Sequence, residues 1–167
     1  MPSALQMAFD DAALQAAVKR SRKLLGKRAL IAAAASAVPV PGLDWAVDAA
    51  MLSRLIPEIN QEFGLTPQQL DKLTPKKREQ VQKAVTLVGS VLIGKFISRE
   101  LVLKAATKIG LRLTTKQLAK YVPFAGQIVA AAVGYAAIRY LGEEHMKDCI
   151  RVARQAQVEL PLLGHQA

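Results

Sequence analysis

The chain has 167 residues and a formal net charge of +10, with 23 lysines and arginines against 13 aspartates and glutamates. This length fits one domain with a sizeable core. The single cysteine, Cys149, excludes an intrachain disulfide framework and a cysteine-based metal cage. Although 51% of the residues are hydrophobic, only 5% are aromatic. A core of alanine, leucine, valine and isoleucine predicts an all-α fold, because alanine and leucine favour helices and bulky sheet formers are scarce.

The first predicted helix covers residues 3–27 and changes from amphipathic to basic along its length. Six cations and no acidic residue occupy residues 19–28: Lys19, Arg20, Arg22, Lys23, Lys27 and Arg28. Cations near an anionic membrane surface contribute about 1 kcal/mol each, so this run predicts docking on lipid headgroups. A solvated helix face is an equally good interpretation. Nucleic acid is not expected as a partner, because neither interleaved aromatic residues nor a reading motif accompanies the charge.

Two similar segments, residues 38–50 and 122–134, predict an internal pseudo-repeat. Each has a proline-containing turn before a helix that carries a small residue at every fourth position. Small residues at this spacing share a helix face, where another backbone can approach closely. We therefore predict a bundle of two pseudo-repeated helical hairpins joined by long helices. The turn and packing residues are Pro39, Pro41, Gly42, Ala46 and Ala50 in the first segment and Pro123, Gly126, Ala130 and Gly134 in the second.

Capping residues locate the other helices. The helix before Pro39 continues to residue 37, and the next helix covers 44–63 with Gly64 as its stop. Thr66 and Thr74 each precede a proline, which is typical of a helix start, and predict helices over 67–73 and 75–109. The last helix begins at Pro123 and ends near residue 155. The chain is therefore divided into a basic N-terminal helix (1–28), a helical domain (29–160) and a loose tail (161–167).

Residues 121–138 contain no charged side chain and are the best candidate for crossing a membrane. A helix of this length covers about 27 Å, close to the roughly 30 Å of bilayer hydrocarbon. We expect residues 121–141 to lie in or against the bilayer. A tight helix pair in water is the alternative, because alanine and glycine contribute little transfer free energy.

Residues 31–48 (IAAAASAVPVPGLDWAVD) and 55–65 (LIPEINQEFGL) resemble the uncharacterised helical domain of YcjF-type bacterial inner-membrane proteins. They are also similar to the helical domain of the immunity-related GTPases. Residues 122–126 (VPFAG), Gly134 and residues 141–142 fit the second half of the bacterial pattern. The resemblance implies an all-α, non-catalytic, membrane-associated domain that works beside a GTPase or a lipid surface. Any such GTPase is expected to be a separate chain.

Few residues point to chemistry. Asp44 and Asp48 lie one helical turn apart and could bind a cation, although helix capping and pairing with a basic residue are the favoured interpretation. His145 and Cys149 are also one turn apart, but with Glu144 they do not form a metal-ligand set. The segment 89–96 is similar to a phosphate-binding loop but has Phe96 where a magnesium ligand is needed, so we interpret it as helix. We expect no enzyme activity, cofactor or metal.

The sequence therefore predicts a non-enzymatic, membrane-associated helical protein that docks on or inserts into an anionic membrane. The alternative is a soluble helical interaction module that binds a partner protein such as a separate GTPase. Self-association through the small-residue faces stays open. Asp10 and Asp11 occupy the region where a secretory signal needs an apolar run. We expect a location on the cytoplasmic side of the bacterial inner membrane, and otherwise in the cytoplasm.

Overall fold

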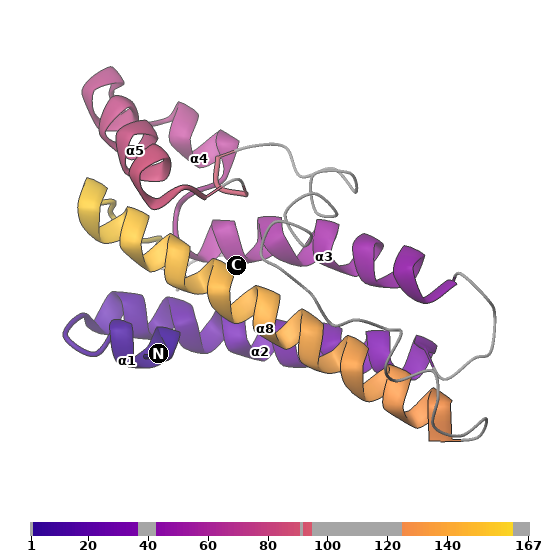
Figure 1. Ribbon diagram of the computed structural model, residues 1–167. Helices are drawn as coiled ribbons and strands as arrows, with labels where there is room; N and C mark the ends of the chain where they lie inside the picture. The colour runs from indigo at the N-terminus through magenta and orange to yellow at the C-terminus, as the bar shows by residue number, and fades with distance from the viewer. Residues whose placement is uncertain (1, 37–42, 91, 95–124, 162–167) are drawn as a thin grey trace, which may run out of the picture.

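The computed structural model describes residues 2–36, 43–90, 92–94 and 125–161. In these ranges all regular secondary structure is helical, which confirms the all-α prediction (Figure 1). The helices are α1 (Ala4–Met7), α2 (Ala12–Ser36), α3 (Leu43–Glu62), α4 (Pro67–Asp71), α5 (Pro75–Val88) and α8 (Ala125–Ala156).

Helix α8 is the central element of the described fold. Its 32 residues contact α1, α2, α3 and α5, and α2 packs in addition against α3 (Figure 1). Most of the largest buried side chains come from the three long helices and fill the space between them. They include Leu14 and Leu25 of α2, Leu55, Ile59 and Phe63 of α3, and Ile138, Met146 and Ile150 of α8.

The N-terminal region contains two helices where the sequence predicted one. Ser3 caps α1 and forms a capping box with Gln6. The Asp11 carboxylate accepts hydrogen bonds from the backbone amides of Ala13 and Leu14, at 2.9 and 3.0 Å, and so begins α2. The prediction of one helix over 3–27 was wrong because this cap was overlooked. Helix α2 then continues to Ser36, so the predicted boundary between residues 28 and 29 falls inside a helix.

The capping residues between α3 and α5 are confirmed. Gly64 adopts the left-handed conformation (φ 69°) directly after α3, as a glycine that ends a helix does. The hydroxyl of Thr66 accepts a hydrogen bond from the Gln69 amide and begins α4, while Thr74 does the same for Lys77 in α5. Local sequence determined these three boundaries.

Helix α5 is shorter than predicted. Gly89 has a φ of 71°, and its amide donates to the carbonyls of Val85 and Thr86, which ends the helix at Val88. The predicted helix over 75–109 is therefore wrong at residues 89–90 and 92–94, while residues 91 and 95–109 lie outside the described ranges. Gly89 is a helix stop and not a packing residue, because no atom lies within 4 Å of the position its Cβ would take.

The predicted small-residue faces are only partly described. Helix α3 contains Ala46, and helix α8 contains Gly126, Ala130 and Gly134. The contacts of these four residues lie outside the part of the chain that the structure describes. Ala50 is exposed and is not packed within the described part of the chain, so its packing on another backbone stays a prediction. The turn residues Pro39, Pro41, Gly42 and Pro123 lie outside the described residues, so the pseudo-repeat stays a prediction.

A close approach between helices does occur, at Gly142 of α8. A Cβ at this position would lie 2.5 Å from the nearest methyl carbon of Leu25 and 3.2 Å from its Cγ. Leu25 is itself fully buried. The contact between α2 and α8 therefore requires a residue without a side chain at Gly142.

We predict that Gly142→Ala lowers the free energy of unfolding by about 1–3 kcal/mol, the usual cost of overpacking. Gly26→Ala is the matched control, because its Cβ would meet only the end of Arg139 at 3.8 Å. The control should be neutral or gain up to about 1 kcal/mol from the better helix propensity of alanine. Urea denaturation of both variants measures the difference. Equal stabilities would contradict the close contact.

Candidate functional site

The structure divides the six cations of residues 19–28 into two groups. The arginines bind carboxylates of neighbouring helices. Arg20 contacts Glu62 of α3 at 2.5 Å, and Arg28 contacts Glu58 of α3 at 2.5 Å. These two ion pairs join α2 to α3 and are partly shielded from solvent. Arg20 and Arg28, predicted to dock on lipid headgroups, instead have partners inside the molecule.

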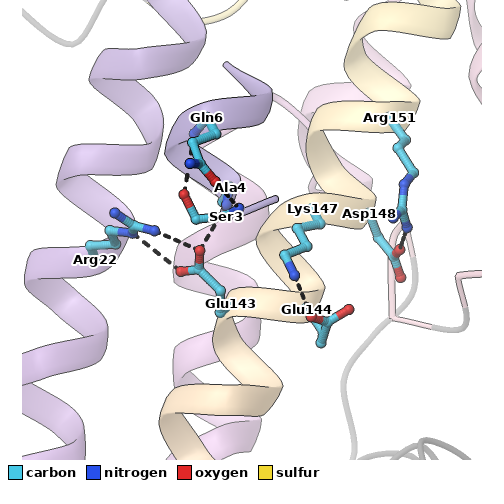
Figure 2. A network of polar contacts seen from close by, with 9 residues as sticks. All are labelled: Ser3, Ala4, Gln6, Arg22, Glu143, Glu144, Lys147, Asp148 and Arg151. Atoms are coloured by element: carbon cyan, nitrogen blue, oxygen red, sulfur yellow. Dashed lines mark hydrogen bonds and ion pairs between the residues drawn. The ribbon is translucent and has the colours of Figure 1, made fainter. Parts of the chain in front are cut away.

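Arg22 takes part in a contact that joins three helices (Figure 2). Its guanidinium donates to both oxygens of Glu143 on α8, at 2.6 and 3.2 Å, and the backbone amide of Ala4 donates to the same carboxylate at 2.8 Å. Burial raises the pKa of Glu143, but the hydrogen bonds from Arg22 and Ala4 outweigh it. The net pKa lies below the ordinary value of 4.5. Glu143 therefore stays ionised and holds α1 and α2 on α8.

The lysines have the opposite arrangement. Lys19, Lys23 and Lys27 are exposed, and their spacing of four residues places them along one face of α2. Leu30 and Ile31 follow one turn later and are 63% and 51% exposed. We call these five residues the lysine face. It combines a line of positive charge with exposed aliphatic side chains.

The division between arginine and lysine has a physical basis. A guanidinium presents a rigid fork that matches a carboxylate with two hydrogen bonds, as Arg22 does with Glu143. A lysine ammonium is a strongly hydrated point charge on a flexible stem. Arginine is thus suited to the helix interfaces and lysine to the outer face. Of the predicted docking residues, the lysine face keeps Lys19, Lys23 and Lys27.

A buried polar cluster lies between α3 and α8. His145 Nε2 is 2.8 Å from Asn60 Oδ1, and the Cys149 sulfur is 3.6 Å from both of these atoms. Asn60 Nδ2 donates to the carbonyl of Leu92 at 2.9 Å. All three residues are buried: Asn60 is 1% exposed, His145 is 3% exposed and Cys149 is 0% exposed. Spacing along α8 paired His145 with Cys149 but did not reveal Asn60. The available signal was that Asn60 shares a helix face with the apolar residues Ile56 and Phe63, which are buried.

This cluster does not have the protonation states of a catalytic cysteine site. Burial lowers the pKa of His145 from 6.5 to about 4 and raises the pKa of Cys149 well above 9. A cysteine nucleophile needs a thiolate, which an adjacent imidazolium stabilises. Here the stable pair is a neutral imidazole and a thiol.

Other charged groups on α8 pair locally. Lys147 binds Glu144 and Arg151 binds Asp148, each within one turn (Figure 2). Asp44 and Asp48 lie in the first part of α3, but their side chains are outside the description. Within the described ranges, no three residues of the types His, Cys, Asp and Glu gather in a way that could hold a metal ion.

Among residues 2–36, 43–90, 92–94 and 125–161, no helix combines the length and apolar character that crossing a bilayer requires.

Comparison with known proteins indicates a distant relationship to interferon-inducible GTPases. The chain is 24% identical over 158 residues to interferon-inducible GTPase 5 of Rattus norvegicus, covering 92% of this chain and 34% of that protein. It is 25% identical over 135 residues to interferon-inducible GTPase 5 of Bos taurus, covering 80% of this chain and 29% of that protein. The chain thus spans about a third of the length of these curated relatives. No protein-family model matches the chain, and no solved structure matches it.

We predict that Glu143→Gln lowers the free energy of unfolding by about 1–2 kcal/mol at pH 7, because it weakens charge-assisted hydrogen bonds to two elements. The folded pKa of Glu143 is lowered, so its contribution is present above about pH 4.5 and is lost as the pH falls through the folded value. The difference between wild type and variant should therefore shrink in acid. Denaturation at pH 7 and pH 3.5 measures it.

Glu79→Gln is the matched control, because Glu79 forms an exposed ion pair with Lys83. Exposed ion pairs contribute little to stability because water and salt screen them, so this variant should be close to wild type. A Glu143→Gln variant as stable as the control would contradict the structural role of this carboxylate.

Proposed function

We propose that the chain is a non-enzymatic helical domain that docks on an anionic membrane surface through its lysine face. The observation that carries this proposal is the division of the cations. Three arginines are bound to carboxylates inside the molecule, while Lys19, Lys23 and Lys27 extend from one exposed face. Helix packing accounts for the three arginines, and the three lysines remain available for an external anionic partner.

The exposed aliphatic side chains add a second contribution. Leu30 and Ile31 follow the lysines on the same helix and are more than half exposed. Charge and apolar burial together favour interfacial binding of an amphipathic helix, with the apolar residues at the boundary between headgroups and acyl chains. In this proposal α2 lies along the membrane surface, and the arginine side of the helix holds the remainder of the bundle above it.

The resemblance to YcjF-type inner-membrane proteins supports the same function. It suggests the cytoplasmic side of a bacterial inner membrane as the location. The anionic lipids of a cytoplasmic leaflet provide the negative surface potential that attracts basic segments.

A second candidate function is a helical module that binds a separate GTPase. The distant similarity to interferon-inducible GTPase 5, which extends over 92% of this chain, favours it. Binding to anionic vesicles, measured without any partner protein, distinguishes the two candidate functions. If the chain stays in the supernatant with anionic vesicles at low salt, membrane docking is overturned and the GTPase-binding module becomes the better proposal.

We predict that replacing Lys19, Lys23 and Lys27 by glutamine weakens binding to phosphatidylglycerol-containing vesicles by roughly 100-fold. Three lysines near the surface contribute about 3 kcal/mol in total, which corresponds to this factor. Vesicle co-sedimentation in 50 mM salt measures the affinity. Binding should also fall steeply in 500 mM salt, because salt screens exposed charges.

The matched control replaces Lys72, Lys76 and Lys83 by glutamine, because all three are exposed and lie outside the lysine face. This variant has the same net charge as the first. It should bind vesicles almost as well as wild type. Equal losses in both variants would mean that net charge alone attracts the chain, and would contradict a defined docking face.

We further predict that Leu30→Ser weakens vesicle binding about fivefold, because roughly 1 kcal/mol of apolar burial is lost. Leu87→Ser is the control, since Leu87 of α5 is 73% exposed but lies on a different helix. The effect of Leu30→Ser should persist in 500 mM salt, where the lysine contribution is screened. The same co-sedimentation assay measures both variants, and an equal response would contradict insertion of the lysine face.

A further inference from the structure

The buried cluster of Asn60, His145 and Cys149 has no part in the proposed docking. It joins three segments of the chain: α3 through Asn60, α8 through His145 and Cys149, and the turn at residues 92–94 through the Leu92 carbonyl. Ile93 in this turn is 2% exposed and packs in the core. The polar contacts therefore hold an apolar turn against the bundle.

The hydrogen bonds determine which nitrogen of His145 is protonated. Because the Leu92 carbonyl is an acceptor, it requires the NH₂ group of Asn60 on its side. The Asn60 oxygen must then face His145, and it can only accept. His145 consequently carries its proton on Nε2, and the Cys149 thiol is placed to donate to the same oxygen.

This tautomer leaves Nδ1 of His145 as the free acceptor of the ring. Nδ1 is buried and has no hydrogen-bond partner. A second proton would have to enter there. It would create a buried positive charge with a donor that faces no acceptor, and both consequences are costly.

Among the side chains that the structure describes, the carboxylates of α3, α5 and α8 are already paired. On α8, Glu143 binds Arg22, Glu144 binds Lys147 and Asp148 binds Arg151. On α3, Glu58 and Glu62 bind Arg28 and Arg20 of α2, and on α5, Glu79 binds Lys83. No charged group among the described residues offsets the effect of burial, which lowers the pKa of His145 to about 4.

We propose that Asn60 and His145 form an acid-operated latch, in which protonation of Nδ1 opens the contact between α3 and α8 and releases the turn at residues 92–94. The proton is taken from water, and the imidazolium reaches solvent only when the cluster opens. Above about pH 6.5 the ring is neutral in both closed and open forms, so the latch stays closed. As the pH falls below 6.5 the open form binds the additional proton and the closed form does not, so opening becomes progressively more favourable towards pH 4.

The chain has only two histidines, His145 and His165, which makes the latch directly measurable. In the His165→Gln variant, nitrogen-15 NMR reports His145 alone. At pH 7 the ring should show the Nε2-protonated neutral tautomer. Between pH 6 and pH 4 the amides of residues 92–94 should exchange faster with solvent than the amides of α2, after correction for intrinsic exchange rates.

The His145→Gln variant is the decisive comparison, because glutamine takes up no proton in this range. After correction for intrinsic rates, its 92–94 amides should exchange at the same rate at pH 4.5 as at pH 7, whereas in the chain with His145 they should exchange at least tenfold faster at pH 4.5. If the variant does not fold, the tautomer and amide exchange of the His165→Gln chain still test the latch. A ring that titrates near pH 6.5 without a change in these amides would overturn the proposal.

Asp148 is the other titratable group close to the turn, since Ser90 donates a hydrogen bond to it. Burial raises its pKa in the closed form, so its protonation should favour closing and oppose the latch. The Asp148→Asn variant separates the two groups. It should keep the wild-type opening between pH 6 and pH 4. Opening that is lost in Asp148→Asn and retained in His145→Gln would assign the acid response to Asp148 and overturn the latch. A negative result here leaves the vesicle experiments unaffected, so the two proposals fail separately.

Discussion

The contact between α2 and α8 at Gly142 and Glu143 organises the described fold. Gly142 lets Leu25 approach the α8 backbone so closely that a Cβ at this position would force the buried leucine to shift. The next residue, Glu143, uses its carboxylate to bind Arg22 of α2 and the first amide of α1. Apolar close packing and a charge-assisted hydrogen bond therefore act at adjacent positions. This combination fixes both the separation of the helices and their register, because apolar packing alone is non-directional.

The same contact explains how one basic segment can serve two purposes. Helix α2 turns its arginines toward α3 and α8 and its lysines toward the outside. The arginines hold the helix in place, so the lysine face is presented on a rigid support and not on a flexible tail. A supported face loses less conformational entropy when it binds a surface.

The buried cluster shows a different use of polar groups. Asn60 and His145 satisfy one another and the Leu92 carbonyl, but one ring nitrogen has no partner. A network of this kind gives a specific geometry at neutral pH and becomes unfavourable when the ring is charged. An apolar cluster of equal volume would hold α3 and α8 together at every pH. The choice of histidine at this position is what makes the contact sensitive to acid.

Helix boundaries that depend on neighbouring residues were predictable from the sequence. The caps at Thr66, Thr74 and Gly64 involve amides and carbonyls within one helical turn, so their roles can be inferred from a few neighbouring residues of the sequence. The cap at Asp11 and the stop at Gly89 carried the same kind of local signal and were overlooked. The all-α class also followed from composition alone, since alanine- and leucine-rich chains with few aromatic residues favour helices.

The sequence by itself determined the helical class, most of the caps, and the presence of six cations in residues 19–28. Only the tertiary structure decided which of these cations are bound and which are exposed, because the partners Glu58, Glu62 and Glu143 lie far along the chain. It also decided that Asn60 meets His145 and that Gly142 meets Leu25. Spacing along one helix shows which residues share a face, but the residue opposite that face depends on how the helices pack.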